Sequence, residues 1–165
     1  MPLDSLEKLF VEELKDTYNA EKQLVRALKK LADAASDEEL KSAFTDHRAE
    51  TEEHVTRLEK VFESLDMKPK GKTCKGVQGI VEEGKEMMEE DGEPEVIDAA
   101  LIAGAQRAEH YEISAYGTLA HYAERLGYSD AAKLLKQTLE EEKAADEKLN
   151  RIAKRVVNPK AEAAA

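Results

Sequence analysis

The chain of 165 residues has a single cysteine, Cys74. One thiol cannot form a disulfide within the chain, and it cannot build a cysteine-rich metal site. Long apolar segments are also missing, because no run approaches the roughly 18 residues that a helix needs to cross a bilayer. The sequence therefore predicts neither a disulfide scaffold nor a membrane protein.

Basic residues are in the minority, since 25 Lys and Arg stand against 36 Asp and Glu, a net charge of −11. Nucleic acids and anionic membrane surfaces both require a basic face, so neither is an expected partner. The first residues, Met-Pro-Leu-Asp-Ser, lack the basic and then apolar pattern of a signal peptide. We therefore expect a cytoplasmic protein that attracts cations.

Aromatic residues make up only 5% of the chain, whereas charged residues reach 37%. Together with abundant Ala, Glu, Lys and Leu, this composition is typical of an all-α protein, and the length is that of one domain. Apolar residues recur at helical spacing in four stretches, each of which predicts a long amphipathic helix. These stretches are residues 4–34, 36–65, 94–127 and 129–157.

Residues that favour helix ends stand at the borders of these stretches. Asp4, Ser36 and Ser129 occupy positions where N-caps are expected. Pro94 suits the first residue of the third helix, and Gly127 is a natural stop for it.

The segment 66–92 has a different character, because one proline and five glycines interrupt it while a loose helical period persists. We expect a long crossover that carries a short helix lying across the bundle; a mobile loop is the alternative. Short links within two helix pairs and one long link between them predict a ferritin-like four-helix bundle. Residues 1–158 would form this single domain, and residues 159–165 a frayed tail.

Each predicted helix turns polar near its middle, although apolar residues line both of its ends. Antiparallel packing brings the four middles to one level, so these polar side chains should converge. They are Glu21 on the first helix, His47, Glu50 and His54 on the second, Glu109 and Glu112 on the third, and Glu142 and Asp146 on the fourth.

The converging carboxylates lack an obvious countercharge, because no Lys or Arg lies on the four apolar lines. Burying one unpaired ion costs several kcal/mol, and a whole domain is stable by only about 5–15 kcal/mol. The groups must therefore be hydrated, protonated or neutralised by bound cations. Two divalent metal ions bridged by carboxylates fit best, and oxygen ligands with one or two imidazoles suit iron or manganese. The alternative for each single Glu is a solvated surface residue.

Four stretches, taken together, resemble the YciE/YciF family of ferritin-like proteins over about residues 3–157. The resemblance implies a relationship to rubrerythrins and bacterioferritins, a ferroxidase-like or stress-related role, and a homodimer. The stretches are Tyr-Asn-Ala-Glu-Lys-Gln-Leu at 18–24, His-Arg-Ala-Glu-Thr at 47–51, Glu-His-Tyr-Glu-Ile-Ser-Ala-Tyr-Gly-Thr-Leu at 109–119, and Leu-Glu-Glu-Glu-Lys-Ala-Ala-Asp-Glu-Lys-Leu at 139–149.

The wider ferritin-like pattern places Glu-x-x-His on the second and fourth helices. Here the second helix instead has His47, then Glu50, and then His54 four residues later. The fourth has Glu142 followed by Ala145 where the pattern has histidine, which deprives the second metal of its usual imidazole.

Two hypotheses remain open at this point. In the first, the protein binds two ions of iron or, second, manganese, and oxidises Fe²⁺ with O₂ or H₂O₂. In the second, it is a non-catalytic, stress-induced structural dimer with a vestigial or hydrated metal site, and segment 66–92 is a candidate for the dimer surface.

The first hypothesis assigns a place to each ligand. Glu50 and one of Glu109 and Glu112 bridge the metals, and terminal places go to Glu21 and Glu142. The remaining positions belong to His47 or His54 and to Asp146.

Overall fold

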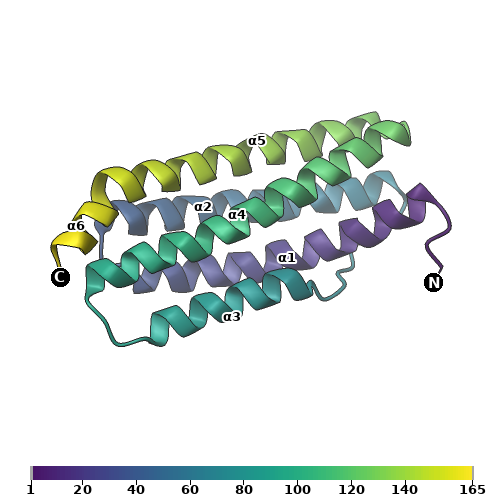
Figure 1. Ribbon diagram of the computed structural model, residues 1–165. Coiled ribbons are helices and arrows are strands. Elements are labelled where there is room, and N and C mark those ends of the chain that lie inside the picture. The colour runs from purple at the N-terminus through teal and green to yellow at the C-terminus, as the bar shows by residue number, and fades with distance from the viewer. Residues whose placement is uncertain (1, 165) are drawn as a thin grey trace.

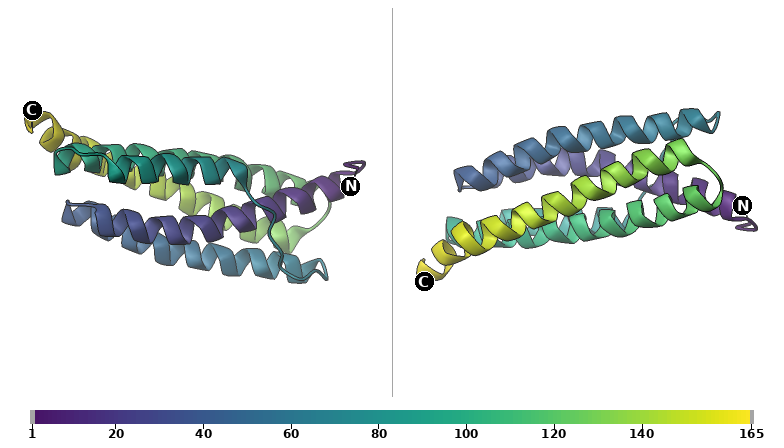
Figure 2. Two further views of the ribbon diagram at one scale, coloured as in Figure 1. Left: turned by 90° about the horizontal axis from the view of Figure 1, so that it is seen from below. Right: turned by 90° about the horizontal axis from the view of Figure 1, so that it is seen from above.

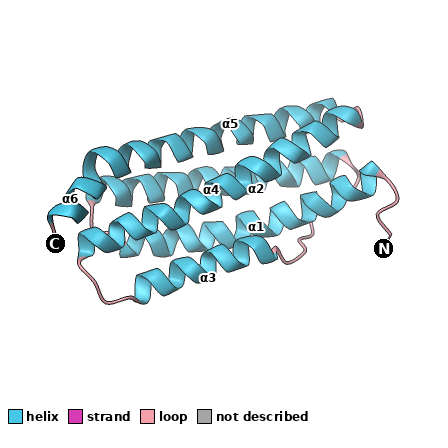
Figure 3. Cartoon of the chain, viewed as in Figure 1, coloured by secondary structure: helices cyan, strands magenta, loops and turns pink. Residues whose placement is uncertain are grey.

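The computed structural model describes residues 2–164, and over this range it consists of helices and their connections (Figure 3). Met1 and Ala165 lie outside the described residues. The predicted all-α bundle with one long crossover is confirmed. Its four long helices are α1, Leu6–Ala34, α2, Glu38–Ser64, α4, Pro94–Arg125, and α5, Ser129–Ile152; a further helix, α3, Lys75–Glu89, lies between α2 and α4.

The four long helices close into a bundle in which each touches two neighbours. Helix α1 packs along α2, and α4 packs along α5; α2 also contacts α5, and α1 contacts α4 (Figures 1 and 2). Short connections make each consecutive pair antiparallel. The middles of all four helices therefore lie at one level.

Helix α3 runs beside α1 and α4, on the outside of the bundle, and not across it (Figure 1). The backbone N–H of Cys74 donates to Asn19 Oδ1 at 2.8 Å, and the Cys74 thiol lies 3.1 Å from the Tyr111 hydroxyl. Buried Val77 packs with Leu24 in a small apolar cluster. These contacts hold the crossover in place, so the mobile-loop alternative is wrong for α3.

The first two N-caps lie one residue later than expected. Ser5, and not Asp4, caps α1, and Asp37, and not Ser36, caps α2. The second shift has a visible cause in Asp98 of α4. Its carboxylate accepts hydrogen bonds from the backbone N–H groups of Ser36 and Asp37, each at 2.8 Å. Asp98 thereby ties the turn between α1 and α2 to α4.

Two of three other predicted helix borders lie where the sequence places them, and the third differs in its cap. Pro94 opens α4, and Gly127 follows its end with a φ of 77°, as predicted. Ser129 is the first residue of α5 and makes no cap, because Tyr128 holds that position without a side-chain hydrogen bond.

The C-terminal segment is helical where a frayed tail was expected. Helix α5 continues through a π-helical turn, η1, Ala153–Val157, into α6, Asn158–Ala163, which packs on α4. Pro159 does not end the helix; it stands at the start of α6, directly after the π-helical turn.

The apolar core is divided in two along the bundle. One cluster contains Phe10, Phe62 and Leu119; the other contains Leu28, Phe44 and Ile152. On each of the four long helices, buried polar residues separate the members of the two clusters. The polar layer therefore crosses the middle of the molecule.

Two glycines of α3 provide a test of how tightly this helix is docked. A Cβ at Gly76 would lie 2.6 Å from a ring carbon of Tyr111, whereas a Cβ at Gly79 meets no atom within 4 Å. We expect Gly76→Ala to lower the free energy of unfolding by about 1–3 kcal/mol. Gly79→Ala should raise it by up to about 1 kcal/mol, because alanine favours the helix. Urea denaturation measures both, and equal effects of the two changes would contradict the observed docking.

Candidate metal centre

The layer between the two apolar clusters contains six buried ionisable side chains, and every long helix contributes at least one. Each is at most 8% exposed. They are Glu21 from α1, His47 and His54 from α2, Glu109 and Glu112 from α4, and Glu142 from α5.

One group of possible metal ligands lies between α2, α4 and α5. His47, Glu109, Glu112 and Glu142 each offer one ligand atom, and these atoms all lie within 4.8 Å of one another. The Nε2 atom of His47 is 2.9 Å from Glu109 Oε1 and 3.5 Å from Glu142 Oε2.

A second group lies beside the first and shares a member with it. Glu21, His54 and Glu142 again bring ligand atoms within 4.8 Å of one another. His54 Nδ1 is 2.8 Å from Glu142 Oε1 and 3.6 Å from Glu21 Oε1. Glu142 belongs to both groups and therefore stands between the two positions that a pair of ions would occupy.

Both imidazoles come from α2, and none comes from α5, where Ala145 stands at the position at which the ferritin-like pattern has a histidine. His47 and His54 are seven residues apart, about two helical turns, so they lie on one face of α2. His47 belongs to the first group and His54 to the second; His54 also belongs to a third, less buried group with Glu50 and Glu141. One imidazole is thus available to each metal position although α5 provides none there.

Several buried atoms of the layer have no hydrogen-bond partner. Among them is His54 Nδ1, which lies close to a Glu142 oxygen but in a direction unsuited to a hydrogen bond. A buried polar atom without a partner costs about 1–3 kcal/mol. Convergent, unpaired oxygen and nitrogen atoms are the donor set that divalent iron or manganese accepts, so the residues fit a metal centre. The unpaired oxygens are Glu21 Oε2, Glu109 Oε2, Glu112 Oε1 and both oxygens of Glu142.

The outer nitrogen of each imidazole faces a carboxylate near the surface. His47 Nδ1 lies 3.0 Å from Glu50 Oε2, and His54 Nε2 lies 2.8 Å from Glu141 Oε2. If these outer nitrogens donate their protons, the inner nitrogens keep lone pairs that are available to a metal ion. This is the usual arrangement of metal-binding histidines. Arg57 holds Glu141 in turn, with Nη2 donating to Oε1 at 2.9 Å.

Several predicted ligands take places that differ from their expected roles. Glu109 and Glu112, one of which was expected to bridge the metals, both belong to the first group alone. Glu50, expected to bridge, binds the outer side of His47 with its side chain 39% exposed. Glu142, expected to be terminal, is shared by both groups. Asp146 lies apart from them, because its carboxylate pairs with His110 Nε2 at 3.2 Å and accepts from Gln106 at 3.3 Å.

Glu141 is a member of the site that the sequence reasoning missed. It stands in a run of three glutamates, 140–142, in which spacing alone singles out only Glu142 as facing the core. A signal was nevertheless present in Arg57, which follows His54 by three residues and so lies on the same face of α2. A basic residue beside a buried imidazole indicates a carboxylate between them.

Burial and mutual repulsion control the protonation of the carboxyl groups. Burial, with the negative charges of Glu142 and Glu21 beside it, raises the pKa of Glu112 well above its usual value. Burial also raises the pKa of Glu142, although His54 opposes the shift. At Glu21 burial acts in the same direction, but the nearby imidazole of His54 outweighs it and lowers the pKa.

The imidazoles respond in the opposite way to the same surroundings. Burial disfavours the charged form of His54, but contacts with Glu142 and Glu21 outweigh burial and raise its pKa to about 10. For His47, burial is likewise outweighed by Glu109 and Glu50, and the pKa is raised. Without metal, the protein therefore binds protons tightly in this layer.

The charges of the layer do not balance from within. Four buried carboxyl groups face two buried imidazoles, so two negative charges remain when all four carboxyl groups are ionised and both imidazoles are protonated. Protons on Glu112 and Glu142, whose pKa values are raised, would remove these two charges. Among the described residues, no Lys or Arg pairs with any of these four carboxylates, and Arg57 reaches only Glu141 nearer the surface. Two divalent cations carry four positive charges, which would neutralise the four carboxylates while both imidazoles stay neutral.

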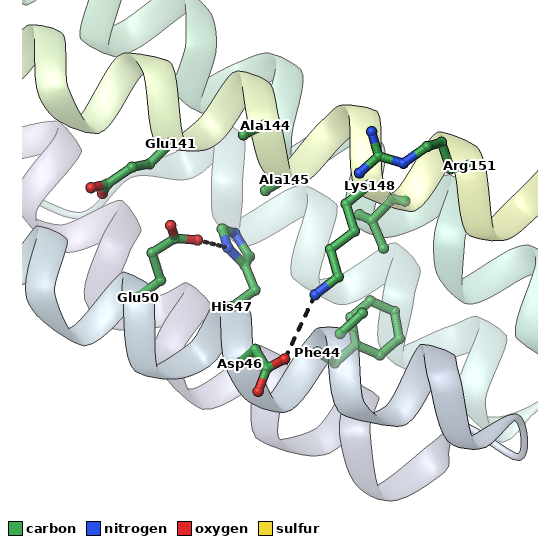
Figure 4. A pocket seen from close by; sticks show the side chains of 11 residues that line it. Phe44, Asp46, His47, Glu50, Glu141, Ala144, Ala145, Lys148 and Arg151 are labelled. Carbon is green, nitrogen blue, oxygen red and sulfur yellow. Dashed lines mark hydrogen bonds and ion pairs between the residues drawn. The ribbon is translucent and has the colours of Figure 1, made fainter.

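A cavity of about 410 Å³ opens the centre to solvent between α2 and α5 (Figure 4). His47, Glu50 and Glu141 line its inner end, and the small side chains of Ala144 and Ala145 leave room above them. Figure 4 shows Glu50 directed at the His47 ring and Glu141 approaching from the opposite helix. Small molecules can therefore reach the edge of the buried layer.

Residues 5–162, which include every candidate ligand, match the family described as Domain of unknown function (DUF892). The chain belongs to the DUF892 family.

Similar proteins agree with this membership. Protein YciF of Escherichia coli (strain K12) is 53% identical over 163 residues, which cover 98% of both chains. The resemblance to the YciE/YciF family is thus confirmed. The crystal structure of the E. coli stress protein YciF has a TM-score of 0.91 at 52% identity, and the alignment covers 94% of this chain and 99% of that one.

Two further solved structures share the fold. YcfI of Rhodopseudomonas palustris, described as a candidate structural protein, has a TM-score of 0.88 at 41% identity over 91% of this chain and 97% of its own. A protein of Xanthomonas campestris pv. campestris has a TM-score of 0.76 at 20% identity over 96% and 98% of the two chains. The latter likeness concerns the fold alone. Within residues 2–164, no helix is both long and apolar enough to span a membrane.

The raised pKa of His54 predicts how the stability of the metal-free protein depends on pH. The folded state keeps the proton up to about pH 10, whereas an unfolded histidine loses it near 6.5. Stability contributed by this proton is complete below about pH 6.5 and is lost as the pH rises toward 10. We expect the free energy of unfolding to fall by roughly 2–4 kcal/mol between pH 7 and 10. Urea denaturation measures it, and His54→Gln should flatten the curve; a wild-type curve that is flat or rises would contradict the assignment.

The contact between Glu141 and His54 predicts a role in metal affinity. Glu141→Ala removes the group that orients the imidazole, so divalent metal should bind about 10–100-fold more weakly with an unchanged number of ions per chain. Glu140→Ala is the matched control, because Glu140 pairs only with Lys143 on the surface. Competition with a metal-binding dye measures both. Equal affinity of the two variants would show that Glu141 does not position the ligand.

Proposed function

We propose that the buried layer holds two divalent metal ions and that the protein consumes O₂ or H₂O₂ as a ferroxidase-type stress protein. Iron is our first choice for both ions, and manganese is the second choice. One observation carries this proposal. Four buried carboxyl groups converge with unpaired oxygens, and no Lys or Arg among the described residues pairs with them. The description of YciF as a stress protein supports a role in the stress response.

The ligand assignment follows the two groups. Glu142 would lie between the ions, since it belongs to both groups. Glu21 and His54 would hold one ion, and His47 and Glu109 the other, with Glu112 beside the second. In this assignment Glu50 and Glu141 orient the imidazoles from outside, and Asp146 takes no part.

The chain has four tasks in this function. The carboxylates neutralise the ions, and the apolar clusters on either side keep water away from the layer. The Tyr116 hydroxyl donates to Glu21 Oε1 and fixes that carboxylate. Iron, when bound, supplies the electrons that pass to oxygen or peroxide. The cavity between α2 and α5 offers the oxidant a way in.

A structural, non-catalytic dimer is the second candidate, and the description of YcfI favours it. In that case the layer would hold protons in place of metal, as the raised pKa values of Glu112 and Glu142 allow. A homodimer belongs to both candidates and is part of the proposal.

Metal content and oxidation chemistry test the leading proposal together. Purified protein titrated with Fe²⁺ without oxygen should bind about two ions per chain, and admission of O₂ or H₂O₂ should produce near-ultraviolet ferric absorbance. Glu142→Ala should abolish the signal, because it removes the ligand common to both groups, whereas Glu140→Ala should leave it unchanged. Bound iron with no oxidation in the wild type would refute the catalytic role.

Thermal stability separates the two candidates by an independent route. A ligand of the native state must raise the melting temperature, so added Fe²⁺ or Mn²⁺ should stabilise the wild type and not Glu142→Ala. A melting temperature indifferent to Fe²⁺, Mn²⁺ and Zn²⁺ would reject the metal centre and favour the structural dimer.

A further inference from the structure

The cavity beside the centre is much larger than an oxidant needs. Its volume is about 410 Å³, whereas a water molecule occupies only about 30 Å³ of the liquid. Dioxygen and peroxide are of similar size to water. Sites that bind organic ligands span about 300–1,000 Å³. The cavity is thus in the size range of a small-molecule site.

Small side chains create the space. Ala43 of α2 and Ala144 and Ala145 of α5 line the cavity, and none extends beyond Cβ. Ala145 stands where the ferritin-like pattern has a metal-binding histidine, so the room arises at the position where an imidazole is missing. Phe44 and Leu149 add apolar walls.

The two ends of the cavity have different chemistry. The inner end has His47, which belongs to the metal centre, and beside it the carboxylates of Glu50 and Glu141. The outer end has two basic residues of α5, Lys148 and Arg151, which are three residues apart and lie on one face of the helix (Figure 4). An elongated molecule with an anionic end fits this arrangement.

Both basic groups are free to change partners. Lys148 Nζ lies 3.6 Å from Asp46 across the cavity, and Arg151 lies 3.3 Å from Glu147 of its own helix. The side chains of these pairs are 47% to 71% exposed. Exposed ion pairs contribute little to stability, so an incoming carboxylate can replace either acidic partner.

We propose that this cavity binds a small organic carboxylate, with its charged end at Lys148 and Arg151, its apolar body against Phe44 and Leu149, and its far end beside the metal centre. This inference rests on the proposed function, because the far end of the ligand lies beside a metal centre only if the buried layer binds metal. It adds an organic molecule to the substrates of a centre that otherwise meets only metal ions and oxidant.

Benzoate and hexanoate are suitable probes, and benzamide is the uncharged counterpart of benzoate. Calorimetry on the metal-loaded protein should detect both carboxylates, with benzamide at least tenfold weaker. The double change Lys148→Ala with Arg151→Ala should weaken benzoate about 10–100-fold, because it removes charge-assisted hydrogen bonds. Ala145→Leu should abolish binding by filling the cavity. Lys143→Ala, on the same helix but outside the cavity, should have no effect.

Three outcomes would overturn the proposal. These are failure of both carboxylates to bind, equal binding of benzoate and benzamide, and equal affinity of all the variants. If Ala145→Leu slows metal loading while no carboxylate binds the wild type, the cavity is an entry path for ions and the proposal is wrong.

The number of metal ions bound per chain shows whether a negative result contradicts the carboxylate site or the metal centre. Ala145→Leu should still bind as many ions as the wild type, which shows that the variant folds and that its centre is intact. Protein that binds metal but no carboxylate refutes only the organic ligand. Protein that binds benzoate in the cavity but no metal refutes the metal centre and leaves the carboxylate site standing.

Discussion

The burial of four carboxylates with too few positive charges beside them is the constraint on which the rest of the structure depends. Water cannot stabilise these groups, and the two imidazoles offset only half of their charge. Every neighbouring feature reduces that cost: a tyrosine hydroxyl donates to Glu21, and shifted pKa values place protons where repulsion is strongest. Cations from solution are the alternative means of neutralisation.

The divided core shows how a small domain can tolerate such a layer. Apolar clusters on both sides supply the stabilising burial, and the crossover helix adds a third, smaller cluster on the outside. The polar layer is thin along the bundle, so it interrupts each helix face for only a few turns. Because all four long helices continue through it, the two apolar ends hold its ligand atoms in register.

Much of this arrangement could be predicted from the sequence, and the reasons are local. Apolar spacing and link lengths determine the four helices and the crossover, and the coincidence of polar middles brings Glu21, His54 and Glu142 together. Sequence spacing could not separate Glu141 from its neighbours, nor show that Asp146 is drawn aside by His110. Those roles depend on how far each helix is rotated about its axis, which contacts between helices decide. The N-cap of α2 moved for a similar reason, because Asp98 reaches the turn before α2 from a distant part of the chain.

The single ring of His54 touches two consecutive residues of α5, Glu142 at one nitrogen and Glu141 at the other. Neighbouring residues of a helix point about 100° apart, so the ring lies between the side chains of Glu141 and Glu142 and contacts both. Helix α5 cannot roll in either direction without losing one of these two contacts. The angular setting of a whole helix is thereby locked at one imidazole.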